Sequence, residues 1–338
     1  MITDIVSAVT RLKPYQFEGS IEDCALCGAS QHRVVGRRAR NGQKLRTVLC
    51  LNCGMVYTNP MPTQDEVLNF YRRHYREHYQ GRTIPSKKHI AKTKKGAYNR
   101  AEIITPYLPN NAAIVDVGSG GGEFVHEMKQ RGYRAFGIEP HHGFAQYSRD
   151  AYGIEVINDG WETADISDGQ LDAVSANHVL EHFRDPVGAL QQFRSWLKPD
   201  GLLFLSVPNI EHPGKTPYGR FHFAHLYNFN EATFLMMTRK AGFEPLPDQD
   251  LGPTTKLLRP TTQPCSDWMT YPQNATRLDE FFQTYTNRRH FLTFTPYLRW
   301  FQRMGRLGSN MLLVNLPVFT KRHVAAADPG RRNGRDNS

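Results

Sequence analysis

The fold is decided by the sequence from Ile114 to Phe124, which reads IVDVGSGGGEF. A short apolar run typical of a β-strand carries one acidic residue, Asp116, and passes at once into a glycine cluster. The amphipathic run from Glu123 to Arg131 then predicts a helix. A strand, a glycine turn and a helix N-terminus together let a ligand lie against bare backbone at the edge of an α/β sheet.

The glycine spacing distinguishes between two kinds of cofactor. The dinucleotide fingerprint Gly-x-Gly-x-x-Gly, begun at Gly118, requires a glycine where Glu123 stands. The spacing present is Gly118-x-Gly120-x-Gly122, with Asp116 two residues before it. A carboxylate at this place would repel a pyrophosphate but suits a ligand that carries an ammonium group and a sulfonium. The pattern favours S-adenosylmethionine over NAD.

The chain beyond this turn alternates between helical and strand patterns. Alternation predicts a Rossmann-like, doubly wound α/β sheet of mostly parallel strands that binds ligands at the strands' carboxyl ends. A last, antiparallel strand is expected at Asn310–Leu316. The other expected strands are Ala135–Ile138, Glu155–Ile157, Leu171–Ala176 and Leu202–Val207, and the expected helices are Tyr98–Leu108, Glu123–Arg131, Gly143–Tyr152, Pro186–Leu197 and Glu231–Ala241.

Polar residues follow the expected strands. Glu139 ends the second strand, where a carboxylate can accept both ribose hydroxyls, although a surface turn residue fits the same position. Asp159 and Trp161 follow the third strand and offer an acceptor for the adenine amino group and a ring for its face. Ordinary packing of the Trp161 indole is the alternative. Asn177 ends the fourth strand beside the expected methyl donor.

The turn after the fourth strand reads NHVLEH, and three interpretations of it remain open. His178 or His182 is a general base that takes a proton from the methyl acceptor. Alternatively His178, Glu181 and His182, with His222 or His225 from the next loop, hold a divalent ion that orients a catechol-like substrate. The third interpretation is a mainly structural turn.

The segment Pro208–Phe229 is long, loop-like and rich in histidine, tyrosine and phenylalanine. Long loops at strand ends usually bind substrate, so this segment is expected to form the acceptor pocket. The polar side chains expected to line it are His212, Tyr218, His222, His225 and Tyr227.

Four cysteines near the N-terminus have the spacing of a zinc ribbon. Cys24 and Cys27 form one Cys-x2-Cys pair, and Cys50 and Cys53 form a second after a spacer of 22 residues. Four thiolates leave no open coordination position, so a structural Zn²⁺ is predicted. Disulfides are the alternative, which a cytoplasmic chain disfavours. Cys265 has no partner in this pattern.

Charge and hydropathy limit where in the cell the protein is expected. The chain has 338 residues and a formal net charge of +10. No apolar run reaches membrane-span length, and the N-terminus lacks a secretory signal, so a cytoplasmic location is expected. The basic run at 72–100 is a solvated surface or an attraction site for an anionic partner. The aromatic and basic segment Phe291–Leu307 is a lid helix, or an interfacial helix on the anionic inner face of a membrane.

These observations predict four parts in the chain. Residues 1–60 form the zinc ribbon, and 61–97 form a helical and basic segment whose 80–95 stretch is expected to be a linker or a mobile loop. Residues 98–323 form the sheet domain, with a substrate loop and helical insertion at 208–308. The tail at 324–338 is expected to be disordered.

With these motifs, the chain from about 98 to 245 resembles the class I S-adenosylmethionine-dependent methyltransferases. The resemblance implies a seven-stranded sheet, with the cofactor held by Asp116, Gly118, Gly120 and Glu139. Related quinone and RNA-end methyltransferases bind a metal through Glu-x-x-Glu-His, where this chain has His178 in place of the first glutamate. The motifs that carry the resemblance are Val115–Gly122, Glu139, Leu171-Asp172, His178–His182, Leu197–Gly201, Val207–Asn209, His225–Phe229 and Gly242-Phe243.

The ribbon, together with Asn59-Pro60-Met61-Pro62, resembles a bacterial subgroup associated with surface-polysaccharide, sugar or secondary-metabolite modification. The expected function is therefore methyl transfer to a hydroxyl of a small molecule or glycan. One alternative is an RNA methyltransferase that uses the ribbon and the basic run, although the Asn-Pro-Pro-Tyr motif used on base amines is absent from the sequence. The other is an inactive, methyltransferase-like binding module.

Overall fold

The computed structural model describes residues 18–71, 84–212, 215–217, 219–262, 267–292 and 297. The chain divides into two units, Met1–Asn287 and Arg288–Ser338, and every element from β1 to α9 belongs to the first. The short helix α10 (Asn287–Leu292) begins where the first unit ends. The expected strand Asn310–Leu316 and the expected tail at 324–338 lie outside the described residues, as does most of Phe291–Leu307.

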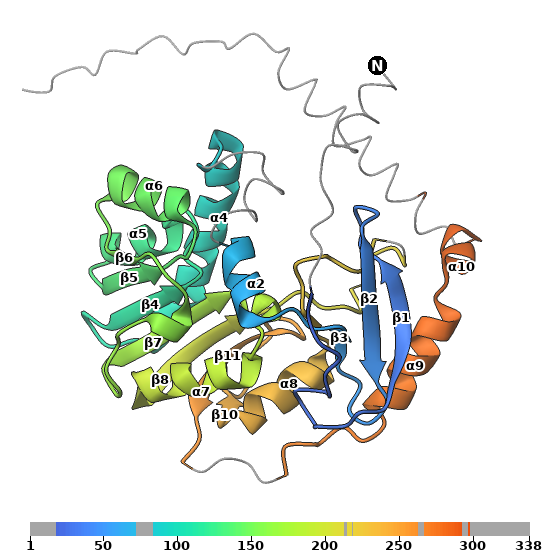
Figure 1. Ribbon diagram of the computed structural model, residues 1–338. Helices are drawn as coiled ribbons and strands as arrows, with labels where there is room; N and C mark the ends of the chain where they lie inside the picture. The colour runs from blue at the N-terminus through green and yellow to red at the C-terminus, as the bar shows by residue number, and fades with distance from the viewer. Residues whose placement is uncertain are drawn as a thin grey trace, which may run out of the picture. The chain divides into compact units, whose positions relative to one another are not determined.

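A seven-stranded sheet forms the centre of the first unit (Figure 1), as expected for the doubly wound fold. The pairs β4–β5, β5–β6, β4–β7 and β7–β8 are parallel, and β11 runs antiparallel to both β8 and β10. In spatial order the strands are β10 (Phe243–Pro245), β11 (Thr255–Pro260), β8 (Leu197–Ser206), β7 (Leu171–Asn177), β4 (Ala113–Val117), β5 (Arg134–Ile138) and β6 (Val156–Ile157).

The antiparallel strand of this sheet is β11, a segment in which the sequence analysis placed no strand. Leu257 and Leu258 of β11 are fully buried against β8, so this strand belongs to the core. The prolines and threonines around it are typical of a loop, which is why no strand was predicted here. The seven strands that the described residues contribute to this sheet all lie before Thr261.

Helices cover both faces of the sheet (Figure 1). Successive residues of a strand point to opposite faces, so Ile114 packs in one hydrophobic cluster and Val115 in the other. The Ile114 cluster holds α4 (Lys87–Ile104), α5 (Glu123–Gln130) and α6 (His142–Tyr152). The Val115 cluster holds α7 (Pro186–Trp196) and α8 (Glu231–Lys240).

The linker expected at 80–95 differs from the structure over its second half. α4 begins at Lys87, after Ser86 accepts a hydrogen bond from the His89 N–H as N-cap. Lysine has a good helix propensity, so a lysine-rich run with an N-cap continues into the apolar stripe of Ala97, Ala101 and Ile104. The earlier helix α2 (Gln64–Asn69) starts with a capping box formed by Thr63 and Glu66.

The N-terminal part forms a four-stranded antiparallel sheet in the order β1 (His32–Arg38), β2 (Lys44–Cys50), β3 (Val56–Thr58) and β9 (Tyr227–Asn228). The last strand comes from the expected acceptor loop and pairs with β3. A ribbon of β1 to β3 is thus completed by a segment far along the chain.

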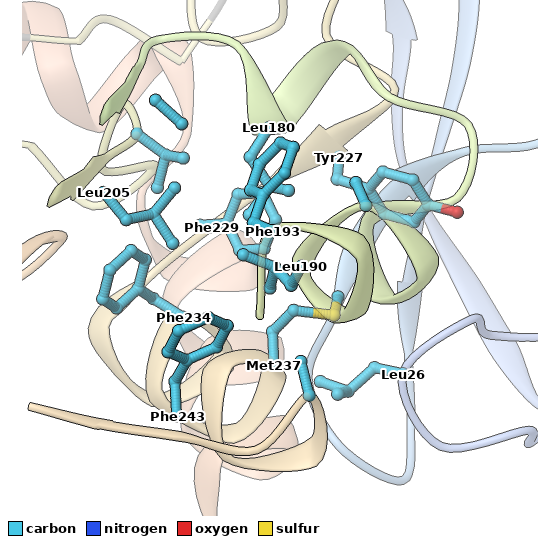
Figure 2. Packing of buried hydrophobic residues seen from close by; sticks show 14 of the residues in the cluster. Leu26, Leu180, Leu190, Phe193, Leu205, Tyr227, Phe229, Phe234, Met237 and Phe243 are labelled. Atoms are coloured by element: carbon cyan, nitrogen blue, oxygen red, sulfur yellow. The ribbon is translucent and has the colours of Figure 1, made fainter. Parts of the chain in front are cut away.

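The ribbon and the sheet domain also share one hydrophobic core. Leu26, between the first two cysteines, lies beside Met237 of α8 (Figure 2). Lys240 donates hydrogen bonds to the carbonyls of Leu26 and Ala25 at 2.6 and 3.2 Å. In α9 (Asn274–Thr284), Asn274 donates to the Cys53 carbonyl at 3.0 Å, so both cysteine turns are tied to helices of the second half of the chain.

Candidate active site

A cavity of about 580 Å³ opens at the carboxyl ends of β4, β5 and β7, within the size range of small-molecule sites. Its wall includes the glycine turn after β4, residues that follow β5 and β6, and the turn after β7. Residues from α2 and α4 complete it. Of the sequence-predicted site residues, Asp116, Gly118, Gly120, Glu139, Asp159, Trp161, Asn177, His178 and His182 line this cavity.

The glycine turn after β4 needs its glycines for two different reasons. Gly118, Gly120 and Gly122 have φ of +68°, +58° and +83°, a region that disfavours side chains. Gly122, the third glycine of the predicted cofactor-binding turn, is absent from the cavity wall. It is the N-cap of α5, and a Cβ there would lie 2.4 Å from Ile154 Cδ1, so its role is packing against the α6 region.

Glu139 is held in place by backbone donors at the end of β5. Its two carboxylate oxygens accept hydrogen bonds from the N–H groups of Gly120 at 2.8 Å and His141 at 3.0 Å. The side chain is 4% exposed and lines the cavity. A fixed carboxylate at this place fits the predicted ribose hydroxyls.

Asp116 is paired with a residue that the sequence analysis did not identify. Arg100 of α4 donates to both Asp116 oxygens, at 2.8 and 3.2 Å, and to Ser175 Oγ at 2.8 Å. Burial raises the pKa of Asp116, and Arg100 opposes that rise. Arg100 lies among Ala97, Ala101 and Ile104 on the buried face of α4. A single cation within an apolar stripe is the sequence signal that could have identified Arg100 as a site residue.

The residues after β6 form the far wall. Asp159 and Trp161 line the cavity as predicted. The Trp161 ring also packs on Phe183 and Phe193, with centroid distances of 5.8 and 6.3 Å. The indole is thus both a cavity wall and part of the core.

His178 directly follows β7 in a left-handed conformation with φ of +57°. Its N–H donates to the Ser206 carbonyl at 2.8 Å, which continues the β7–β8 pairing by one residue. The side chain is 53% exposed and faces the cavity. A non-glycine residue held at positive φ is typical of functional sites.

His182, in the 3-10 helix η4 (Leu180–His182), also lines the cavity but is held much more tightly. Its Nδ1 lies 2.7 Å from the Ala224 carbonyl oxygen and 2.6 Å from the Tyr71 hydroxyl. Its Nε2 lies 3.7 Å from Glu181 Oε1. The ring is therefore fixed at one edge, and its other edge turns toward the remaining polar groups of the turn.

Glu181 and His225 lie outside the cavity wall, behind His182. Glu181 is 1% exposed, and burial raises its pKa to about 8. His225 Nε2 lies 4.0 Å from Glu181 Oε1, and burial lowers the pKa of His225. His222 stacks on His225 at 4.5 Å, and burial lowers its pKa to about 2. Burial thus shifts Glu181, His222 and His225 each toward the neutral form.

The expected acceptor-pocket residues are mostly elsewhere. His212, His222 and Tyr227 are absent from the cavity wall, and Tyr218 lies outside the described residues. Tyr227 is buried in β9 and donates to the Arg184 carbonyl at 3.1 Å. The loop faces the ribbon because Arg40 N–H donates to the Phe221 carbonyl and Thr58 N–H to the Leu226 carbonyl, each at 2.8 Å.

The four cysteines come together as the sequence predicts. Their sulfurs lie within 4.8 Å of one another, with Cys24–Cys53 at 3.6 Å and Cys27–Cys50 at 3.5 Å. Tetrahedral zinc with Zn–S bonds of about 2.3 Å places its sulfurs about 3.8 Å apart. Gly28 and Gly54 follow the two pairs with φ of +73° and +82°. The donor set and its spacing fit a structural Zn²⁺.

Comparison with known proteins places the sheet domain in a family. Residues 87–247 match the family model described as a methyltransferase domain, and this part of the chain is a methyltransferase domain. The ubiquinone biosynthesis O-methyltransferase of Xanthomonas axonopodis pv. citri is 32% identical over 120 residues, which are 32% of this chain and 49% of that protein. The Haemophilus ducreyi protein of the same name is 29% identical over 106 residues, covering 28% and 45%. The chain thus spans about half the length of the curated relatives it matches.

Among solved structures, the chain is similar to the 1,6-didemethyltoxoflavin-N1-methyltransferase of Burkholderia thailandensis. That similarity has a TM-score of 0.46 and 18% identity, and it covers 61% of this chain and 96% of the other. Within the described part of the chain, no helix is long and apolar enough to cross a membrane.

Proposed function

We propose that this chain transfers a methyl group from S-adenosylmethionine to a hydroxyl oxygen of a small-molecule or glycan acceptor. One observation carries the proposal: a single cavity holds both the Asp116–Gly120 turn with Glu139 and the two histidines that follow β7. The relatives are named as O-methyltransferases, which supports oxygen as the methylated atom.

S-adenosylmethionine, when bound, supplies an electrophilic methyl group. The chain's own contribution is alignment and proton transfer. Glu139 and Asp159 both line the cavity, which supports their proposed contacts with the ribose and adenine ends of the ligand, and the Arg100–Asp116 pair lies beside the glycine turn. His182 Nε2 then accepts the proton of the acceptor hydroxyl, and His178 is the second candidate for that role.

The test is His182→Ala, with His126→Ala as the control because His126 of α5 stacks on Tyr152 and is absent from the cavity wall. General-base loss is expected to lower turnover by about 10²- to 10⁴-fold. Titration calorimetry is expected to show unchanged S-adenosylmethionine affinity. Full activity of His182→Ala would remove the base assignment.

A divalent ion is a second way in which this site can act on a hydroxyl. Glu181, His182 and His225 offer ligand atoms within 4.8 Å of one another, and Glu181 Oε2 is buried with no hydrogen-bond partner among the described residues. Nitrogen and carboxylate ligands suit Zn²⁺, Mn²⁺ or Fe²⁺. Metal analysis that finds two ions per chain, one of them lost in Glu181→Gln, would support this variant.

We also propose that the Cys24, Cys27, Cys50 and Cys53 thiolates hold Zn²⁺ in a structural role. The sulfur spacing supports it, and the two tied cysteine turns give such an ion a part in holding the ribbon against α8 and α9.

A further inference from the structure

Tyr71, the second residue after α2, touches both the cavity and the histidine of the β7 turn. It is one of the residues that line the cavity. Its hydroxyl lies 2.6 Å from His182 Nδ1 and donates to the Ala224 carbonyl at 3.3 Å. The two rings meet edge to face at 5.4 Å. One hydroxyl therefore joins α2, the η4 turn and the acceptor loop.

The proton positions in this group follow from its distances. A carbonyl oxygen can only accept, and the Ala224 oxygen lies 2.7 Å from His182 Nδ1, so Nδ1 carries a proton. Tyr71 gives its own proton to the same carbonyl, and its oxygen takes a share of the Nδ1–H. In the neutral ring, Nε2 is then unprotonated. This is the nitrogen that a base or a metal ligand must present.

Tyr71 is itself held firmly. Its ring packs edge to face on Phe70 at 5.4 Å, and Phe70 packs on Phe223 at 5.9 Å. Phe70 is 3% exposed and Phe223 is also 3% exposed. The hydroxyl position is thus set by a packed cluster that includes the residue beside Ala224.

We propose that Tyr71 is a positioning residue for His182. With the Ala224 carbonyl it holds the Nδ1–H edge of the ring, which leaves Nε2 as the unprotonated nitrogen. This inference rests on the proposed function, in which His182 Nε2 takes the acceptor proton. The arrangement follows the general pattern of a base oriented by a third group.

The experiment is Tyr71→Phe, which removes only the hydroxyl, in full-length protein labelled with ¹⁵N-histidine and bound to S-adenosylhomocysteine. The His182 nitrogen signals, assigned by their loss in His182→Ala, report the tautomer directly. Tyr57→Phe is the matched control, because the Tyr57 hydroxyl donates to the Glu22 carbonyl at 3.3 Å and Tyr57 is absent from the cavity wall.

Wild type and Tyr57→Phe are expected to show the Nδ1–H tautomer, and Tyr71→Phe a smaller excess of it, because the Ala224 carbonyl then remains as the acceptor of the Nδ1–H. Turnover of Tyr71→Phe is expected to fall by about 10- to 100-fold, the range seen when an orienting partner is lost, with KM for S-adenosylmethionine within about twofold. An unchanged tautomer, or a changed tautomer with wild-type turnover, would overturn the positioning role. Failure of the base assignment is separate, since it appears as full activity of His182→Ala whatever the tautomer.

Discussion

Glu181 shows how strongly burial alters a single residue in this site, against the opposing effect of Lys215 on its pKa. No cation is paired with its carboxyl group among the described residues, and its ion-pair distances are all to histidines. Burial raises its pKa to about 8, while burial lowers the pKa of His222 to about 2. Burial therefore favours the neutral form of both the Glu181 carboxyl group and the His222 imidazole, since a low-dielectric surrounding disfavours charge.

The first prediction concerns the free energy of unfolding of Glu181→Gln. Between pH 4.5 and 8 the folded wild type binds more protons at Glu181 than the unfolded chain, so stability falls as pH rises through this window. From pH 4.5 to 7 the loss is on the order of 3 kcal/mol. Glutamine cannot ionise, so the variant should lack this decline.

Denaturant unfolding without added divalent metal measures the effect best from pH 6.5 to 8. Below that window His222 contributes the opposite slope, because its unfolded form binds a proton that the folded form excludes. Glu102→Gln is the control, since the Glu102 side chain is 53% exposed. Equal slopes for wild type and Glu181→Gln would contradict the prediction.

At the scale of elements, the strand-to-helix turns could be predicted and the contributions from α2 and α4 could not. Asp116 and Glu139 lie where parallel strands end, a place that alternation alone identifies. Arg100 and Tyr71 reach the cavity from elements that precede β4, and no local pattern indicates where such elements pack. β11 was missed because its flanking prolines and threonines resemble a loop.

The acceptor loop illustrates a different reason for error. Its length and histidines predicted a pocket, but its backbone pairs with β3, which depends on a partner far away in sequence. His222 and His225 consequently lie behind His182 and not in the cavity wall. Long-range strand pairing carries no local signal.

A second prediction concerns the two ends of α5, where two glycines have nearly the same φ. Gly122 and Gly132 have φ of +83° and +86°. A Cβ added at Gly122 would contact Ile154, whereas a Cβ added at Gly132 would have no other atom within 4 Å. Gly132→Ala is expected to cost about 1 kcal/mol through backbone strain, and Gly122→Ala at least about 2 kcal/mol. Thermal or denaturant unfolding measures both, and equal costs would show that the packing contact is unimportant.

At the scale of the whole first unit, the ribbon and the methyltransferase domain should unfold together. They share a core in which Leu26 and Met237 both take part, and they share the β3–β9 pairing. We therefore expect Cys53→Ser, or treatment with a chelator that removes the proposed Zn²⁺, to lower the Tm of a single calorimetric transition by more than about 5 °C. Cys265→Ser is the control, because Cys265 lies outside the four-cysteine motif.

Independent unfolding of the ribbon would be visible in the same calorimetric measurement. A separate low-temperature transition in Cys53→Ser, with an unchanged main transition, would mean that the ribbon melts independently. Retained S-adenosylmethionine affinity with reduced turnover in that variant would place its effect on the acceptor side, where the β9 segment holds Ala224 near His182.

The β9 pairing also has a consequence for synthesis on the ribosome. The edge of β3 at Val56–Thr58 emerges early, yet its partner at Tyr227–Asn228 is made only after most of the methyltransferase sheet has been translated. Until then the nascent ribbon presents an open strand edge of the kind that pairs with other chains. Its maturation must wait for the last third of translation, and a chain that stalls before Tyr227 would leave the ribosome with that edge exposed.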